Sequence, residues 1–255
     1  MRRNDKKLSY VYNMTINQYG INIMTVSDNQ ISLMKSLISE ERRKKAEKCL
    51  FVADAKRSIL AEILILYAIR KSFNADTSEI KFDKLQYGKP VIKNHKEWCF
   101  NISHSGNWVV CAVGDHPIGI DVEEMDVWYA SIAEHFFSIH ENKRIRKFSH
   151  EKDRMKEFFK LWTLKESYLK KNGEGLRRRL DSFEFYSVEG KEIVIDNFVR
   201  CDECNFFSFF LDENYVVSLC CESDEVTDMQ VLEGNTLSEN IREWKNLSSH
   251  SKNDS

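Results

Sequence analysis

Residues 39–70, SEERRKKAEKCLFVADAKRSILAEILILYAIR, share their layout with residues 138–169, SIHENKRIRKFSHEKDRMKEFFKLWTLKESYL, which lie 99 positions further along the chain. In each copy a serine precedes a short charged stretch, and an aspartate fifteen residues after it precedes a longer, more apolar one. Serine and aspartate are common helix N-caps, so each copy predicts two consecutive helices. The predicted short helices span 40–48 and 139–147, and the predicted long helices span 55–70 and 154–171.

A second repeat lies in the strand-like regions, where Asn107-Trp108-Val109-Val110 recurs as Asn214-Tyr215-Val216-Val217. Both copies fall in apolar runs of strand length and composition. Two repeats in the same order predict a duplicated α+β chain, a pseudo-dimer of two similar α+β halves. The predicted divisions are an N-terminal half over 1–120, a C-terminal half over 121–224 and a polar tail over 225–255, whose end we expect to be loose.

Turn residues between the apolar runs predict one hairpin in each half. Residues 108–113 would turn at Gly114-Asp115-His116-Pro117 into residues 118–122, and residues 206–211 would turn at Asp212-Glu213-Asn214 into residues 215–221. The sheets are therefore expected to be antiparallel in part.

Composition excludes several function classes. The 38 Lys and Arg residues against 40 Asp and Glu leave a formal charge of -2, so no basic field would attract nucleic acid. The longest apolar stretch, residues 58–70, is interrupted by Glu62 and is too short to span a bilayer. With no secretory signal pattern at the N-terminus, we expect a cytoplasmic protein without nucleic-acid or membrane partners.

Seven cysteines, an odd number, fit reduced thiols better than a disulfide framework. Cys201 and Cys204 have the spacing of a zinc knuckle, and Cys220 and Cys221 follow. Adjacent cysteines are poor partners in a tetrahedral site, so a zinc site is the less favoured interpretation and ordinary thiols the favoured one.

Three carboxylates are candidates for a metal site. Asp121 and Glu123 are two apart on a predicted strand and so share a face, while Glu124 points to the other. The pair suits a hard cation, although a solvated acidic turn would look the same. Glu166 lies within the apolar helix 158–170, where it and Lys170 could carry a function or form a structural ion pair four residues apart.

Anion-binding groups lie nearby in the sequence. Residues 98–106, WCFNISHSG, offer Ser103, His104 and a flexible glycine, which suit phosphate oxygens. No G-x-S-x-G elbow is present, so a serine hydrolase is disfavoured. Further cations come from a tight turn and from the helices of the first half, where charge runs are usually only solvated faces: Lys89, Arg42, Lys45 and Arg57.

Four motifs in this order and spacing, YGKP (87–90), FNISHSG (100–106), PIGIDVE (117–123) and WTLKES (162–167), resemble the 4'-phosphopantetheinyl transferases of the surfactin-synthetase-activating type. The resemblance runs from about residue 38 to residue 185. It implies a monomeric pseudo-dimer with coenzyme A and magnesium in the cleft between the halves. Two departures occur near its start: the usual proline is Glu40 here, and a frequent lysine is Arg42, which leaves helix entry and nucleotide affinity in question.

The resemblance also implies roles for single residues. The magnesium ligands would be Asp121, Glu123 and Glu166, with Glu166 also the group that activates the attacking hydroxyl. The coenzyme A contacts would be Lys89, Ser103 and His104 at the 3'-phosphate, with Arg57, Arg42 and Lys45 at the nucleotide and Lys165 and Lys170 at the diphosphate and substrate.

The implied reaction transfers 4'-phosphopantetheine from coenzyme A to a serine of an apo acyl or peptidyl carrier protein, releasing adenosine 3',5'-bisphosphate. The carrier could serve fatty-acid, polyketide or nonribosomal peptide synthesis, the last as in antibiotic biosynthesis. Two other classes stay open at this point: a coenzyme A binding protein without activity, and a metal-dependent phosphohydrolase that attacks with water.

Overall fold

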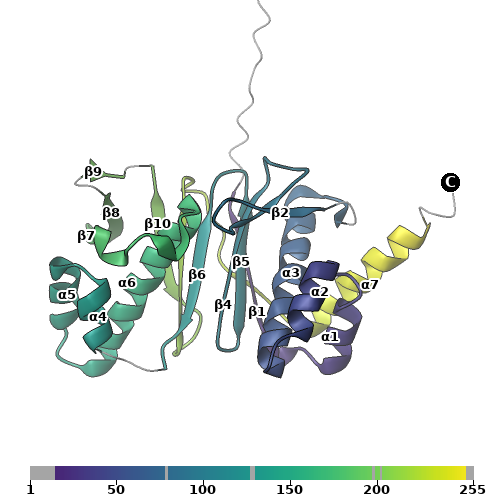
Figure 1. Ribbon diagram of the computed structural model, residues 1–255, viewed down its shortest axis with the longest axis horizontal. Coiled ribbons are helices and arrows are strands. Elements are labelled where there is room, and N and C mark those ends of the chain that lie inside the picture. Colours follow the sequence, from purple (N-terminus) through teal and green to yellow (C-terminus); the bar gives the residue numbers. More distant parts are fainter. Residues whose placement is uncertain (1–14, 78–79, 127–129, 197–198, 202, 251–255) are drawn as a thin grey trace, which may run out of the picture.

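Figure 1 shows a computed structural model of the chain, which describes residues 15–77, 80–126, 130–196, 199–201 and 203–250. The helices are η1 (Ile23–Thr25), α1 (Asp28–Met34), α2 (Glu40–Glu47), α3 (Val52–Phe73), α4 (Ala130–Phe136), α5 (Ile139–Arg146), α6 (Glu151–Asn172), η3 (Gly175–Arg177), η4 (Leu180–Ser182) and α7 (Gly234–His250). The strands are β1 (Asn17–Asn22), β2 (Phe82–Lys84), β3 (Pro90–Ile92), β4 (Cys99–Ser105), β5 (Trp108–Gly114), β6 (Gly119–Glu124), β7 (Phe183–Val188), β8 (Lys191–Asp196), β9 (Val199–Arg200), β10 (Asn205–Phe210), β11 (Tyr215–Cys221) and β12 (Gln230–Leu232).

The two halves follow one plan. In the first half the strand order is β12-β1-β5-β4, and in the second it is β10-β11-β6. Strands β1, β5 and β4 therefore correspond to β6, β11 and β10, and in each half the central strand is antiparallel to both neighbours. The helices match the repeat in length, with eight residues each in α2 and α5 and 22 each in α3 and α6. The predicted α+β pseudo-dimer is confirmed.

Local capping explains the short helices. The Ser39 side chain accepts a hydrogen bond from the backbone N–H of Arg42 at the start of α2, and Ser138 forms a reciprocal capping box with Glu141 at the start of α5. The long helices differ from the prediction, because they begin at Val52 and Glu151, without side-chain caps. Asp54 and Asp153 instead lie in the first helical turn, where their charge complements the helix dipole.

The first predicted hairpin is wrong. Strand β5 pairs with β4 through the tight turn at Gly106 and Asn107, whereas β6 pairs with β11 in the other sheet. The turn after Gly114 thus carries the chain from one half into the next. The second predicted hairpin, β10 to β11, is confirmed, with Phe210 opposite Val216.

Three apolar cores hold these layers together. Alternate residues of the buried strand β5 face α3, as Val109 and Val113 do, or face the second sheet, as Val110 and Ala112 do. A third core lies between α6 and the elements α4, α5, β7 and β8 of the second half. In Figure 1 the two sheets accordingly stand face to face, with α3 outside one and α6 outside the other.

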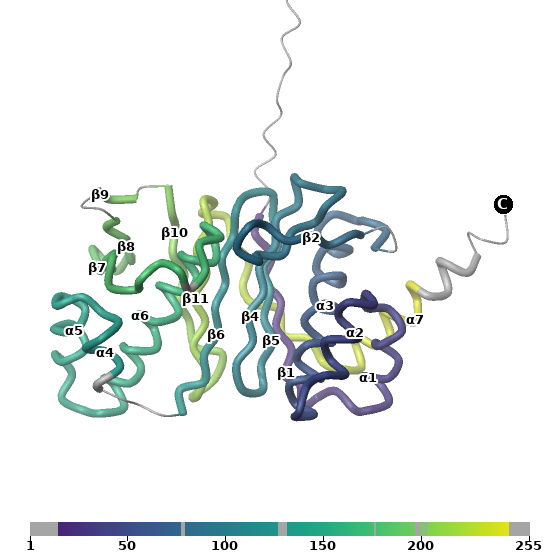
Figure 2. Tube along the Cα trace, in the orientation of Figure 1, coloured from purple at the N-terminus to yellow at the C-terminus, as the bar shows by residue number. Residues whose placement is uncertain are grey.

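The C-terminal segment packs on the first half as far as Trp244, while residues 251–255 of the end that we expected to be loose lie outside the described residues. Strand β12 pairs in parallel with β1, and α7 returns across α1 of the first half, as Figure 2 shows. Leu237 and Ile241 are fully buried, and Trp244 packs near Tyr67 at a ring distance of 6.3 Å. The segment is polar in composition, but its few apolar residues recur at helical spacing and so form one buried stripe.

Within the described part of the chain, no helix combines the length and the apolar character needed to cross a bilayer.

Candidate active site

The two halves meet where the edge strand β4 lies beside the edge strand β6. Polar side chains at alternate positions of β4 link the strands: Asn101 accepts a hydrogen bond from the backbone N–H of Ile120 at 2.9 Å, and Ser103 donates to Asp121 at 2.8 Å. Ser105 then donates to the Glu123 carboxylate at 2.8 Å. Period-two alternation puts these three side chains on one face of β4. The two edge strands are therefore joined here by hydrogen bonds of the β4 side chains and not by a backbone-to-backbone ladder.

Asp121 and Glu123 lie on the same face of β6, as the sequence predicted. This face is turned towards α6, because the alternate residues Ile120 and Val122 point into the core between the sheets. From α6, the Lys170 ammonium reaches Asp121 Oδ1 at 2.6 Å and Ser103 Oγ at 2.8 Å. Lys170 thus forms an ion pair with Asp121 of its own half, and not with Glu166 on its own helix, and its contact with Ser103 crosses the junction to the first half.

Burial and neighbouring negative charge raise the proton affinity of two of these acids, Glu123 and Glu166. Burial, followed by the charge of Asp121, raises the pKa of Glu123 to about 7, and the charge of Glu166 adds to the shift. Burial and the charge of Asp121 also raise the pKa of Glu166. Carboxyls whose pKa values move towards neutrality can exchange protons at physiological pH, which general acid–base chemistry requires.

Two carboxylate oxygens at this junction, Asp121 Oδ2 and Glu166 Oε1, are buried and lack a hydrogen-bond partner. Buried carboxylate oxygens without donors suit a hard cation such as Mg²⁺. The acids thus fit a magnesium ion in chemistry, although no three acidic, histidine or cysteine side chains among the described residues come together in a geometry that could hold a metal. In this conformation the Lys170 ammonium neutralises Asp121 instead.

Two motif glycines permit the close approach of the elements around the junction. Gly106 has φ +48°, and a Cβ there would lie 2.1 Å from both the Tyr215 hydroxyl and the Glu124 carboxylate. At Gly119 a Cβ would lie 1.8 Å from the backbone oxygen of Ser167, so this glycine lets β6 pack directly on α6.

The opposite face of β4 carries His104, beside the cations of the first half. Burial lowers the pKa of His104, and the positive charges of Arg57 and Lys170 lower it further. Arg57 itself donates to the backbone oxygen of Gly106 and to Asp54. The structure therefore brings His104 and Arg57 together, as expected for an anion site.

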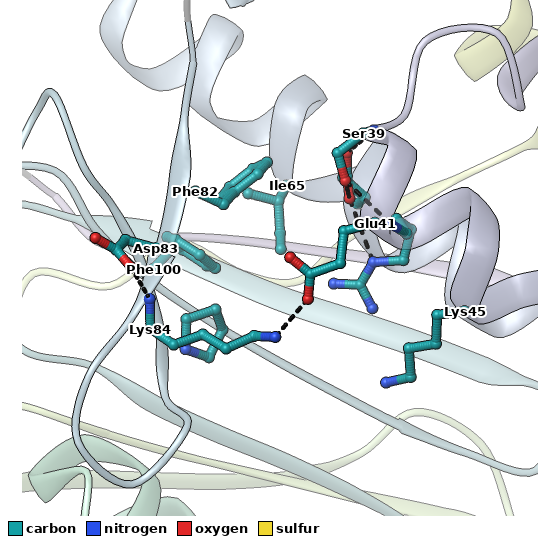
Figure 3. Close-up of a pocket in the computed structure, with 11 residues that line it drawn as sticks. Ser39, Glu41, Lys45, Ile65, Phe82, Asp83, Lys84 and Phe100 are labelled. Atoms are coloured by element: carbon teal, nitrogen blue, oxygen red, sulfur yellow. Dashed lines mark hydrogen bonds and ion pairs between the residues drawn. The ribbon is translucent and has the colours of Figure 1, made fainter.

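Arg42 and Lys45 line a pocket of about 210 Å³ between α2, α3 and β2. Buried Glu62 accepts from Ser39 and, at 3.3 Å, from Arg42 Nε, so it holds the arginine in place. In Figure 3, Lys45 and Lys84 extend from opposite walls towards the same space, and Lys84 bonds to Glu41 at 2.5 Å.

Lys89 lines a neighbouring cavity of about 570 Å³. Its ammonium donates to the backbone oxygens of Lys171 at 2.9 Å and Ile118 at 3.1 Å, so it connects the end of α6 with the start of β6. Burial lowers the pKa of Lys89 to about 8.

Lys165 does not lie where the resemblance implied. Its side chain is fully buried and forms an ion pair with fully buried Glu141 at 2.9 Å. It also donates to the backbone oxygens of Leu180 and Phe183. Consecutive helical residues point about 100° apart, so Glu166 faces the junction while Lys165 faces the core of the second half. In this structure the Lys165 ammonium therefore stabilises the core of the second half and does not face the junction.

Sequence reasoning missed the linking roles of Asn101 and Ser105 and the anchoring roles of Glu62 and Glu141. The alternation of polar residues at 101, 103 and 105 was a usable signal for the first two. Glu141 was also detectable, since Ser138 and Glu141 have capping-box spacing. A lone glutamate within an apolar helix, as at position 62, gives no signal of its partner.

All seven cysteines are free thiols. Cys201 and Cys204 lie with their sulfurs 3.3 Å apart, and nothing among the described residues supports the less favoured zinc interpretation.

The fold and site define a class of protein: an α+β pseudo-dimer with a buried group of carboxylates and a lysine at the junction of its halves. The model of the 4'-phosphopantetheinyl transferase N-terminal family matches residues 25–116, and that of the 4'-phosphopantetheinyl transferase superfamily matches residues 117–220. The two models divide the chain at the turn between β5 and β6. The chain belongs to the 4'-phosphopantetheinyl transferase family, which confirms the resemblance and the enzyme class predicted from the sequence.

Several curated relatives are similar over most of their length. A Bacillus subtilis 4'-phosphopantetheinyl transferase is 33% identical over 82% of this chain and 94% of its own. The gsp transferase of Aneurinibacillus migulanus is 35% identical over 78% and 83%, respectively. Among solved structures, the Thermotoga maritima holo-[acyl-carrier-protein] synthase overlaps with 41% of this chain and 61% of its own at 22% identity and a TM-score of 0.36, too partial an overlap to bear on the fold.

Proposed function

We propose that this protein transfers the 4'-phosphopantetheine group from coenzyme A to a serine of an apo acyl or peptidyl carrier protein. The products are the holo carrier protein and adenosine 3',5'-bisphosphate. The observation that carries the proposal is the meeting of Asp121, Glu123, Glu166 and Lys170, contributed by two elements, at the boundary between two family halves.

In the proposed reaction, a bond forms between the carrier serine oxygen and the β-phosphorus of coenzyme A while the bond from that phosphorus to the bridging oxygen breaks. Glu166 takes the proton of the attacking hydroxyl, which its raised pKa and unpartnered Oε1 favour. Lys170 stabilises the leaving phosphate, because its ammonium already lies at the junction beside Ser103 and Asp121.

Asp121, Glu123 and Glu166 would hold a magnesium ion, which when bound supplies neutralisation of the diphosphate charge. With the acids engaged in this way, the Lys170 ammonium would leave the Asp121 carboxylate and bind a phosphate oxygen of the substrate. Raised carboxyl pKa values support this assignment, since mutually repelling buried acids favour a cation.

The coenzyme would lie along the first half, with its anionic groups near the cations described above. The proposed contacts for the 3'-phosphate are Lys89 beside β6 and Ser103 and His104 on β4, although Ser103 and His104 point to opposite faces of that strand in this conformation. Arg42, Lys45 and Arg57 are the proposed contacts for the rest of the nucleotide. We further propose that the protein acts as a cytoplasmic monomer, because one chain supplies both sides of the junction and all its thiols are free.

The test measures the intact mass of several apo carrier proteins after incubation with coenzyme A and Mg²⁺. Transfer adds a phosphopantetheinyl group to the carrier, whereas consumption of coenzyme A without any carrier adduct would show a phosphohydrolase. The Glu166→Gln variant should lower turnover about 10²- to 10⁴-fold, without recovery at high magnesium. The turnover of Asp121→Asn should recover in part at high magnesium. Glu151→Gln, an exposed residue at the start of the same helix, is the matched control and should keep wild-type turnover.

Wild-type turnover in Glu166→Gln would overturn the assignment of the base. Complete recovery of both variants at high magnesium would reduce Glu166 to a ligand.

A further inference from the structure

A group of thiols outside the proposed active site gathers around the end of α6. Cys201 follows β9, Cys204 precedes β10 and Cys220 lies on β11. The sulfurs of Cys201 and Cys204 are 3.3 Å apart, and Cys220 and the Lys171 ammonium also interact with the Cys204 sulfur. The transfer chemistry uses none of these thiols.

The surroundings make the three thiols chemically unequal. The hydrogen bond from Cys220, with help from Cys201 and from the charge of Lys171, lowers the pKa of Cys204 to about 6 despite its burial. Burial and the bond to Cys204 raise the pKa of Cys201 to about 11, and burial raises that of Cys220 well above its ordinary value. These opposite shifts favour the thiolate at Cys204 over its two neighbours, and the thiolate is the reactive form.

Access distinguishes the partners further. Cys201 and Cys204 are both partly exposed, so a small oxidant can reach them, whereas Cys220 is fully buried behind them. Lys171 is held by an ion pair with Glu222 at 2.9 Å, which keeps its charge next to the thiolate. The geometry thus provides a nucleophilic sulfur, a neighbouring sulfur that can close a bond to it, and a cation that stabilises the starting state.

We propose that Cys201 and Cys204 form a modification site that hydrogen peroxide oxidises to an intramolecular disulfide. The Cys204 thiolate attacks one peroxide oxygen, the S–O bond forms as the O–O bond breaks, and hydroxide leaves and takes up a proton as water. The sulfur of Cys201 then attacks the resulting sulfenic acid: the S–S bond forms, the S–O bond breaks and a second water leaves with the thiol proton. Two thiols and one peroxide become one disulfide and two waters.

The site does not depend on the proposed transferase function, because neither cysteine touches the acids at the junction. Cys49 provides an internal comparison: it is partly exposed, but its sulfur bonds only to the backbone oxygen of Lys45 and has no thiol partner among the described residues.

The experiment treats the reduced full-length protein with hydrogen peroxide at pH 7, alkylates the remaining thiols and identifies linked peptides by mass spectrometry before and after dithiothreitol. We expect a reversible link between Cys201 and Cys204, formed before Cys49 is modified. Cys204→Ser should abolish the link. Cys201→Ser should trap a sulfenic acid on Cys204, detected as a dimedone adduct, and Cys49→Ser should behave like the wild type.

Lys171→Gln should slow the oxidation of Cys204 several-fold, since it removes the stabilising charge. A second measurement needs no variant: in the wild-type protein, iodoacetamide at pH 7 should alkylate Cys204 faster than Cys49. The proposal is overturned if Cys49 is oxidised or alkylated as fast as Cys204, or if peroxide links other cysteines instead.

Discussion

Replacing Lys165 with methionine tests the most consequential placement in the structure. The Lys165 ammonium and the Glu141 carboxylate are both fully buried and lie 2.9 Å apart. Methionine matches the length of the lysine stem but carries no charge, so Glu141 would keep a buried charge without its counter-ion. Removing one partner of such a pair costs about 3 to 5 kcal/mol of unfolding free energy.

For a chain of this size, 1 kcal/mol changes the melting temperature by roughly 2 °C. The Lys165→Met variant should therefore melt about 6 to 10 °C below the wild type in a thermal unfolding experiment. Glu141→Gln should cost less, because Lys165 keeps its bonds to the backbone oxygens of Leu180 and Phe183.

The double variant Lys165→Met/Glu141→Gln removes both charges and should be more stable than Lys165→Met alone, with a coupling energy of about 1 to 3 kcal/mol. Coenzyme A affinity, measured on the folded fraction, should stay close to the wild-type value. The reasoning would be refuted by a Lys165→Met variant that melts like the wild type and binds coenzyme A at least tenfold more weakly. That result would show that Lys165 contacts coenzyme A and does not form a buried ion pair.

Three further predictions concern other parts of the fold. Trp244→Ala should lower the unfolding free energy by about 3 kcal/mol in urea titrations, because this side chain packs near Tyr67 and Arg70. Exposed Arg242→Ala should leave the midpoint of unfolding unchanged, and an unchanged midpoint in Trp244→Ala as well would show that α7 does not stabilise the fold. Gly119→Ala should prevent folding or lower stability by more than about 4 kcal/mol, since its Cβ would overlap the Ser167 backbone oxygen. Gly20→Ala should fold normally, because its Cβ would approach the flexible Met229 side chain at 3.3 Å and Trp108 at an ordinary contact distance of 3.7 Å. Coenzyme A affinity measured by calorimetry should fall as the pH rises above about 8, because Lys89 loses its proton there in the free protein. A bound phosphate would raise the pKa of Lys89, so binding at higher pH requires the uptake of a proton. An equally steep fall in Lys89→Met would assign the pH dependence to another group.

The sequence by itself determined the local features of this protein. The repeat at 99 residues specified both helix pairs, because capping and helical periodicity depend on residues within a few positions of one another. The shared face of Asp121 and Glu123 followed in the same way from the alternation of a strand. The motifs that carry the family resemblance are likewise contiguous, so they indicate the family whichever neighbours the fold gives them.

Tertiary structure alone decided which neighbours these local elements meet. The turn after Gly114 looks like a hairpin in the sequence, yet β6 pairs with β11, nearly 100 residues later, because each half completes its own sheet. Adjacent Lys165 and Glu166 occupy a buried ion pair and the junction, respectively, because α6 lies between a sheet on one side and a core on the other. The polar composition of the C-terminal segment concealed a buried stripe for the same reason: burial depends on whether a distant apolar surface is available, and here α1, α3 and β1 provide one.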